Sequence, residues 1–237
     1  MNLSGPRIHR RVFLGFLAFG LLVGIGVRSG FAQEKISLSE LVGALQKGSD
    51  RTDKVTLVWW APQEYWRATF SQDPIISQAQ ADEIVNFLRP YTIFFVVDGS
   101  MGKFGAVDYK SESEIRANIQ VSDNQGVLYH PLSEDEVNQN AKDFLLMMKP
   151  VFASMIGPMG QNMHAIVFPG KDAKGQPIAD AKKEGNFSVK LYEGEFKWRL
   201  PLGVLLPEKI CPQDGEKMNG AWKFCPWHGV ALTESKQ

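Results

Sequence analysis

The sequence predicts an α+β domain with a mostly antiparallel sheet of about five to seven strands and helices on one face, followed by a small C-terminal appendage. Three observations predict this architecture. Serine-led capping boxes precede amphipathic helical patterns, neighbouring strand-like segments are joined by short turns, and both cysteines lie in the turn-rich end of the chain. Because short turns join strands that run antiparallel, the sheet is expected to be mostly antiparallel.

The first predicted elements are a helix and a buried strand. Ser37 and Glu40 form a capping box, and the apolar residues after them share one helical face until Gly48, where the helix is expected to end. Residues 55–60 are apolar, β-branched or aromatic, which predicts a short buried strand. Pro62 ends this strand and suits the start of a short helix.

A second helix and a central strand follow. Ser77 and Gln80 form another capping box, and the helix that it opens is expected to end at Pro90. Residues 91–97 are apolar on both faces, which indicates a strand covered from both sides. The Asp- and Gly-containing residues 98–102 predict a turn directly after that strand.

The middle of the chain predicts a hairpin and a long helix. Residues 115–121 alternate in polarity and are joined by turn residues to 127–129, so the two segments are expected to pair. A third capping box begins at Ser133. The helix after it is long, and Pro150 is expected to kink or divide it.

The predicted domain closes with one more strand and a second hairpin. Residues 163–168 are strand-like, and the polar residues 170–185 predict a mobile loop. Residues 187–192 and 195–200 alternate on both sides of Glu193, which predicts a hairpin with one apolar face.

Residues 1–32 predict a signal peptide, followed by a domain over residues 33–206 and an appendage over residues 207–237. The segment has a basic start, an apolar run over residues 12–27 and small residues at 30–32 where a signal peptidase cleaves. The run is shorter than the roughly 20 residues that a membrane span needs, and a retained membrane anchor is the alternative.

The basic start carries a more specific pattern. Arg10 and Arg11 are followed by Val12, Phe13 and Leu14, and this order resembles the twin-arginine export signal. The resemblance implies export of an already folded protein, often with a metal or cofactor inserted. The expected location is the periplasm or the outside of a bacterial cell, with membrane contact only through an uncleaved signal.

The charge of the chain gives no reason to expect nucleic-acid binding. Residues 1–32 hold four of the 26 basic residues and no acidic residue, so the remaining chain has a net charge of −4 and lacks basic runs. Nucleic-acid binding depends on a basic surface that neutralises phosphates. The expected partner is instead an unidentified small molecule or an envelope protein.

The end of the chain contains two similar turns that each combine a cysteine with a second metal-capable residue. Cys211 is followed three residues later by Asp214, and Cys225 is followed three residues later by His228. Each cysteine is followed by proline, and each second residue by glycine. Two thiolates, an imidazole and a carboxylate form a chemically sound ligand set for tetrahedral zinc.

This pattern resembles a zinc ribbon, in which two Cys-Pro-x-Cys-Gly knuckles hold one ion. The spacing, both prolines, both glycines and Phe224 before the second knuckle match, whereas Asp214 and His228 stand where the family has cysteines. The resemblance implies a structural zinc ion, because four protein ligands leave no open position for a substrate.

Three alternatives for the cysteines stay open. An exported chain with two cysteines commonly pairs them, so a disulfide between Cys211 and Cys225 is one alternative. A reversible dithiol in a redox module is another, and it requires an accessible thiol with a low pKa. The same turns without a metal are also compatible with the sequence.

The domain itself offers one possible pocket, near Trp59, Trp60 and Asp98, although dense aromatic groups more often pack in a core.

The sequence resembles no named family over residues 33–206. The leading expectation is an exported envelope protein with a binding or interaction domain. A periplasmic enzyme is the rival expectation, and a catalytic site would need Asp98, Asp108 and His130 to converge in a cleft.

Overall fold

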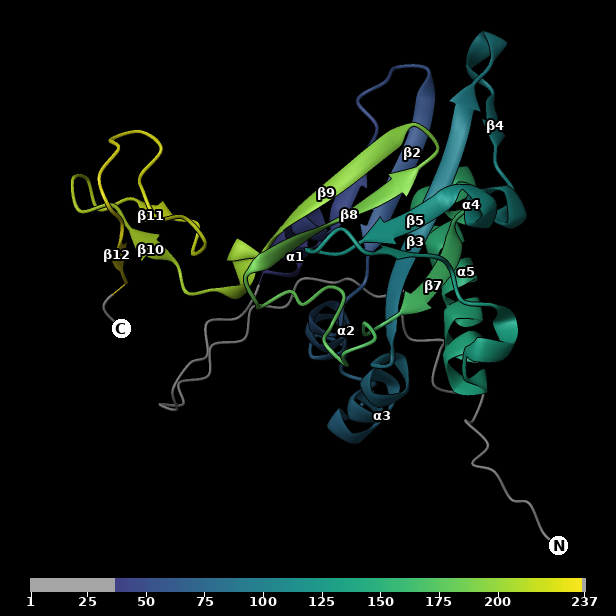
Figure 1. Ribbon diagram of the computed structural model, residues 1–237, viewed down its shortest axis with the longest axis horizontal. Coiled ribbons are helices and arrows are strands. Elements are labelled where there is room, and N and C mark those ends of the chain that lie inside the picture. The colour runs from purple at the N-terminus through teal and green to yellow at the C-terminus, as the bar shows by residue number, and fades with distance from the viewer. Residues whose placement is uncertain (1–36, 236–237) are drawn as a thin grey trace, which may run out of the picture.

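The computed structural model describes residues 37–235, and it shows an α+β protein built around a five-stranded antiparallel sheet (Figure 1). The strand order begins β1 (Gln46–Gly48), β2 (Lys54–Trp60), β3 (Tyr91–Met101). The free edge of β3 then pairs with two strands in succession, β7 (His164–Pro169) along its first half and β4 (Val107–Tyr109) along its second. The predicted fold class is therefore confirmed.

A second antiparallel sheet covers one face of the first. Its order is β6 (Leu128–Tyr129), β5 (Ile119–Ser122), β8 (Gly185–Leu191), β9 (Gly194–Leu200). Aromatic rings join the two sheets. Within the second sheet, Phe187 stacks on Trp198 with the ring centroids 4.9 Å apart. Phe187 also contacts Trp60 of the first sheet edge-on, with the centroids 4.7 Å apart. Such pairs add about 0.5–1.5 kcal/mol each beyond the apolar area that they bury.

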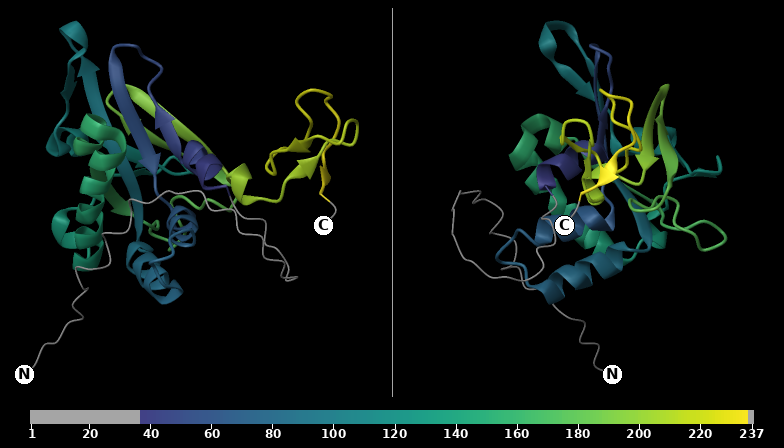
Figure 2. Two further views of the ribbon diagram at one scale, coloured as in Figure 1. Left: turned by 180° about the vertical axis from the view of Figure 1, so that it is seen from behind. Right: turned by 90° about the vertical axis from the view of Figure 1, so that its left-hand side faces the viewer.

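Helices cover the opposite face of the five-stranded sheet, as Figure 2 shows in its right-hand view. Phe95 and Trp59 point to this side, where both contact Phe152 of the long helix, at 4.6 and 5.5 Å between ring centroids. The helices are α1 (Leu38–Leu45), α2 (Gln63–Phe70), α3 (Gln78–Leu88), α4 (Glu112–Asn118) and α5 (Gln139–Gln161), with short 3₁₀ turns η1 (Lys103–Gly105), η2 (Glu134–Glu136) and η3 (Gly203–Leu205).

The strands of the domain are divided between two sheets, whereas the sequence led us to expect one. The reason lies in β3, whose side chains from Thr92 to Asp98 are all buried. Phe94 faces the second sheet, where it meets Phe187, and its neighbour Phe95 faces the helices. A strand that is apolar on both faces needs a covering layer on each side.

The expected strand over residues 115–121 was wrong in its first half. Residues up to Asn118 form α4, and only Ile119 onward is a strand. Ser111 caps this helix through a capping box with Glu114, whose carboxylate accepts hydrogen bonds from the Ser111 amide and hydroxyl at 2.9 and 2.8 Å. The box satisfies amides that would otherwise lack partners, so the local signal overrides the alternating pattern.

Two expected element ends also differ. The helix expected to end at Gly48 ends at Leu45, because the next three residues pair with β2 as β1. The turn expected over 98–102 is strand up to Met101, because β4 pairs with the end of β3. A Cβ on Gly99 would lie 2.8 Å from the Val107 side chain, so the close approach of β4 requires glycine there.

The long helix begins and divides at other residues than expected. Ser133 and Glu136 form the expected capping box, but it caps the start of η2 instead of the long helix. Asn138 caps α5, because its side chain accepts a 2.8 Å hydrogen bond from the Ala141 amide. The backbone leaves the helical region at Gly157 (φ 57°, ψ −132°) rather than at Pro150. Glycine adopts a positive φ without steric cost, so the division falls there.

The appendage stands apart from the domain in Figure 1. Its strands are β10 (Lys209–Ile210), β11 (Lys217–Met218) and β12 (Thr233–Glu234), which form a small sheet of order β11-β10-β12. Its buried core consists of Cys211, Met218 and Cys225. The predicted signal peptide lies outside the described residues, and no helix within residues 37–235 is long and apolar enough to cross a membrane.

Candidate metal centre

The two cysteine turns have the same backbone geometry. The Cys211 amide donates to the Glu216 carbonyl at 2.9 Å, and the Gly215 amide donates back to the Cys211 carbonyl at 2.8 Å. In the second turn, Cys225 takes the place of Cys211, with corresponding bonds to Val230 at 2.8 Å and from Gly229 at 2.9 Å. The appendage is therefore built from two copies of one local structure.

The residues that flank the two turns repeat in the same way. Ile210 pairs with Lys217 across the first turn, and Phe224 pairs with Ala231 across the second, at the same offset from the cysteine. Each turn closes on a glycine with positive φ, 78° at Gly215 and 66° at Gly229. This left-handed conformation explains why glycine follows the second metal-capable residue of each turn.

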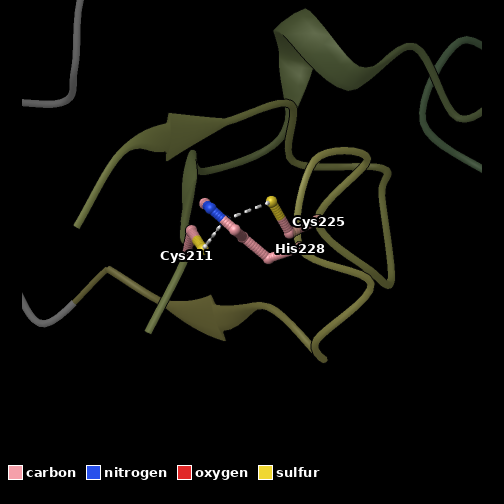
Figure 3. A group of neighbouring side chains, drawn as sticks. All are labelled: Cys211, Cys225 and His228. Carbon is pink, nitrogen blue, oxygen red and sulfur yellow. Dashed lines mark hydrogen bonds between the residues drawn. The ribbon is translucent and has the colours of Figure 1, made fainter. Parts of the chain in front are cut away.

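Cys211, Cys225 and His228 bring their possible ligand atoms together inside the appendage (Figure 3). The His228 Nδ1 atom lies 3.4 Å from the Cys211 Sγ atom and 3.5 Å from the Cys225 Sγ atom. The three ligand atoms all lie within 4.8 Å of one another. The group could hold a metal ion, as the sequence predicted for these three residues.

Asp214 lies at the edge of this group. Its Oδ2 atom is 3.5 Å from the His228 Nδ1 atom, while its Oδ1 atom accepts a hydrogen bond from the Glu216 amide at 2.9 Å. One carboxylate oxygen is thus used by the turn, and the other faces the imidazole. Asp214 is not part of the group whose ligand atoms lie within 4.8 Å of one another, so the structure brings together three of the four predicted ligands. Its carboxylate approaches the same Nδ1 atom that faces the two sulfur atoms, so its role toward an ion at Nδ1 would be that of a fourth ligand.

The pKa values of Cys211 and Asp214 are shifted by their surroundings. Both thiols are buried and free, and burial raises the pKa of Cys211, with the neighbouring Asp214 carboxylate and Cys225 thiol adding to the effect. The Glu216 amide and the Cys211 thiol lower the pKa of Asp214. Without a cation, the thiol is therefore held in its neutral form, whereas a bound metal ion would favour the thiolate.

The structure separates the three residues of the predicted pocket. Trp59 is packed in the core against Tyr65, Phe95 and Phe152. Trp60 lines a cleft of about 340 Å³ at the end of the central sheet, whereas neither Trp59 nor Asp98 lines it.

Asp98 is instead held in a buried polar contact between the neighbouring strands β2 and β3. Its Oδ1 atom accepts a 2.5 Å hydrogen bond from the Thr56 hydroxyl, and Lys54 Nζ is 4.0 Å from its Oδ2 atom. Asp108 and His130 are exposed, and neither they nor Asp98 line this cleft or a second one beside α5. The three residues that a catalytic site would need do not converge in either cleft.

Sequence reasoning missed Glu64, which lines the cleft beside Trp60. Only 8% of this residue is exposed, and its carboxylate accepts a single side-chain hydrogen bond, from Gln63 at 3.4 Å. The available signal was a glutamate that directly precedes the aromatic pair Tyr65 and Trp66 at the start of a short helix.

Comparison of the chain with protein-family models, with curated protein sequences and with solved structures finds no match.

Proposed function

We propose that this chain is an exported envelope protein whose C-terminal appendage is held by a structural zinc ion. The observation that carries the proposal is the position of the His228 Nδ1 atom, 3.4 and 3.5 Å from the sulfur atoms of Cys211 and Cys225. These two cysteines and the histidine come from two turns of matching backbone geometry, so the appendage presents ligands from both halves to one point.

The distances support a tetrahedral ion. In a tetrahedron the ligand atoms are separated by about 1.6 times the bond length, so zinc bonds of about 2.0–2.3 Å place them roughly 3.3–3.8 Å apart. The 3.5 Å between His228 Nδ1 and Asp214 Oδ2 falls in the same range. Thiolate and imidazole ligands favour zinc over magnesium or calcium, which prefer oxygen.

A structural role follows from the small size of the appendage. Its core has three buried residues, Cys211, Met218 and Cys225, with Val230 and Leu232 packed against them. So small a core supplies little stabilisation, and small folds of this kind usually depend on a metal or a disulfide. With Asp214 as the fourth ligand, no position is left open for a substrate.

The export proposal rests on Arg10, Arg11 and the apolar run after them, and the metal site is consistent with it. A protein that folds in the reducing cytoplasm keeps its thiols available for zinc before export. The proposed location is the periplasm or the extracellular space.

A binding role would use the surface of the appendage, where three large aromatic side chains are exposed. They are Trp222, Phe224 and Trp227.

The proposal is tested by elemental analysis of the protein recovered after export, together with a count of free thiols before and after chelation. We expect about one zinc per chain and two thiols that react only once the chelator has removed the metal. An apo appendage with two free thiols would contradict the proposal, as would a disulfide between Cys211 and Cys225. Reversible oxidation at a cellular redox potential would instead indicate a dithiol module.

A further inference from the structure

The cleft lined by Glu64 lies at the end of the five-stranded sheet, far in sequence from the metal centre. The end of β2, the start of α2 and the start of β3 form one side of it, and a loop after β7 forms the other. Its volume of about 340 Å³ is at the lower end of the range for small-molecule sites, roughly 300–1,000 Å³. The cleft therefore suits a ligand of about the size of one amino acid.

The loop that forms the outer wall is well connected, although the sequence predicted a mobile segment over 170–185. Gly170 donates to the Pro90 carbonyl at 2.9 Å, and Ile178 donates to the Gly170 carbonyl at 3.1 Å. Within the loop, Asp172 Oδ1 accepts hydrogen bonds from the amides of Lys174 and Gln176, at 2.9 and 2.7 Å. These bonds fix the wall, so the cleft has a defined shape.

The floor of the cleft is apolar, and two buried polar side chains interrupt it. Trp60, Trp66 and Ile93 contribute apolar surface. Glu64 is more than nine-tenths buried and forms no ion pair within residues 37–235. The hydroxyl of Thr92, in a residue 5% exposed, likewise has no hydrogen-bond partner among the described residues.

Within residues 37–235 the Glu64 carboxylate accepts one long side-chain hydrogen bond, from Gln63 at 3.4 Å, so most of its acceptor capacity is open to a ligand in the cleft. An ammonium group in the cleft would supply the missing charge and several donors to Glu64. Asp180 also lines the cleft, and its carboxylate is paired with Lys183 at 3.7 Å. The rim further carries Arg89 and Lys171, which are exposed and form no ion pair within the described chain. A ligand with only a positive charge would meet repulsion from these two cations.

We propose that the cleft binds a small zwitterion with an apolar body, namely a free amino acid with an apolar side chain. The ammonium group pairs with Glu64, the apolar side chain lies on the floor formed by Trp60 and Trp66, and the carboxylate faces Arg89 and Lys171. This site is independent of the zinc centre and adds a ligand class to the proposed binding role.

The test uses three probes that share one body: L-phenylalanine, 2-phenylethylamine and 3-phenylpropanoate. Binding to the full exported chain is measured by calorimetry. We expect L-phenylalanine to bind most tightly, because only it satisfies both charges. The proposal would be overturned if L-phenylalanine bound no more tightly than either of the other two probes. It would also be overturned if none of the three probes bound.

Variants then assign the contacts. Glu64→Gln should weaken L-phenylalanine binding about 10- to 100-fold, as expected for a charge-assisted hydrogen bond. The double change of Arg89→Gln and Lys171→Gln should weaken it only a few-fold, because exposed charges are screened.

Two further variants keep the test decisive if Glu64→Gln disturbs the fold. Thr92→Val removes the second polar group of the cleft and should also weaken binding. Glu83→Gln alters an exposed glutamate of α3 outside the cleft and should leave binding unchanged. Unchanged binding in Glu64→Gln and in Thr92→Val would overturn the assignment, and zinc content measured in the same samples separates this outcome from failure of the metal proposal.

Discussion

At the scale of single residues, the candidate metal centre depends on side chains whose positions are fixed by two short turns. The second oxygen of Asp214 faces His228 because the first is held by the Glu216 amide. Because Oδ2 approaches the same Nδ1 atom as the two sulfur atoms, the carboxylate would act on a bound ion directly, as a fourth ligand. This role predicts a measurable effect on metal affinity.

Asp214→Asn is expected to weaken zinc binding about 10- to 100-fold, because the amide keeps the shape of the proposed fourth ligand but loses its negative charge. Cys225→Ser, which removes a direct ligand, should abolish stoichiometric zinc. Both are measured by competition with a chromophoric chelator. Glu216→Gln is the matched control, because it changes an exposed carboxylate in the same turn. Loss of zinc in the control, or its retention in Cys225→Ser, would contradict the assignment.

At the scale of elements, each of the two cysteine turns ends on a glycine with a left-handed backbone conformation. Substitution of such a glycine tests the effect of backbone conformation alone. A Cβ at Gly229 would meet no atom within 4 Å, so Gly229→Ala costs only the strain of a left-handed residue, about 1–2 kcal/mol. Since the proposed zinc ion couples metal binding to folding of the appendage, zinc affinity should fall about 5- to 30-fold.

Gly43→Ala provides the opposite case. Gly43 is an exposed residue inside α1, again with no atom near an added Cβ. Alanine there should raise the free energy of unfolding of the domain by about 0.5–1 kcal/mol and leave zinc affinity unchanged. Chemical denaturation measures the stability of both variants, and chelator competition measures their zinc affinity. An equal loss of zinc affinity in Gly229→Ala and Gly43→Ala would contradict the prediction.

The capping box of α4 predicts a dependence of stability on pH. The Ser111 amide and hydroxyl, together with Lys110, lower the pKa of Glu114 from 4.5 to about 2. Because the pKa is lower in the folded chain, the stabilisation is fully present above about pH 4.5 and is lost as the pH falls through about 2. The difference in unfolding free energy between the unmodified chain and Glu114→Gln should therefore be largest near pH 7 and shrink toward pH 2. Denaturant titrations at several pH values measure it, and a constant difference would show that the box does not set the pKa.

At the scale of the whole molecule, the appendage and the domain have separate cores and separate sheets. The strands β10, β11 and β12 pair only with one another, and their buried residues form a cluster distinct from that of the domain. The domain core includes both faces of β3 and needs no contribution from the appendage. The two parts are therefore expected to respond differently to removal of the metal.

Chelation should unfold residues 207–235 and leave the domain folded. Hydrogen exchange followed by mass spectrometry is expected to show loss of protection at Cys211 and Cys225 and unchanged protection along β3. Readdition of zinc should restore the protection, and magnesium at the same concentration is the control. Loss of protection in β3 after chelation would show that the domain depends on the appendage.

The sequence by itself determined the local features of this protein. The capping boxes at Ser77 and Ser133, the β8–β9 hairpin and the two turns that carry Cys211 and Cys225 all depend on residues close in the chain, whose hydrogen bonds and backbone preferences act over a few positions. Cys211, Cys225 and His228, whose possible ligand atoms the structure brings together, were predictable for the same reason.

Only the tertiary structure decided the division of the strands into two sheets, the extension of β3 to Met101 and the cleft that contains Glu64. These features depend on which distant segments pair and pack. Asp98 illustrates the difference: it has the composition of a turn, but its place in β3 follows from pairing with β2 and β4. Glu64 and Thr92 likewise line the same cleft only because β2, α2 and β3 converge there. No local pattern in the sequence encodes that convergence.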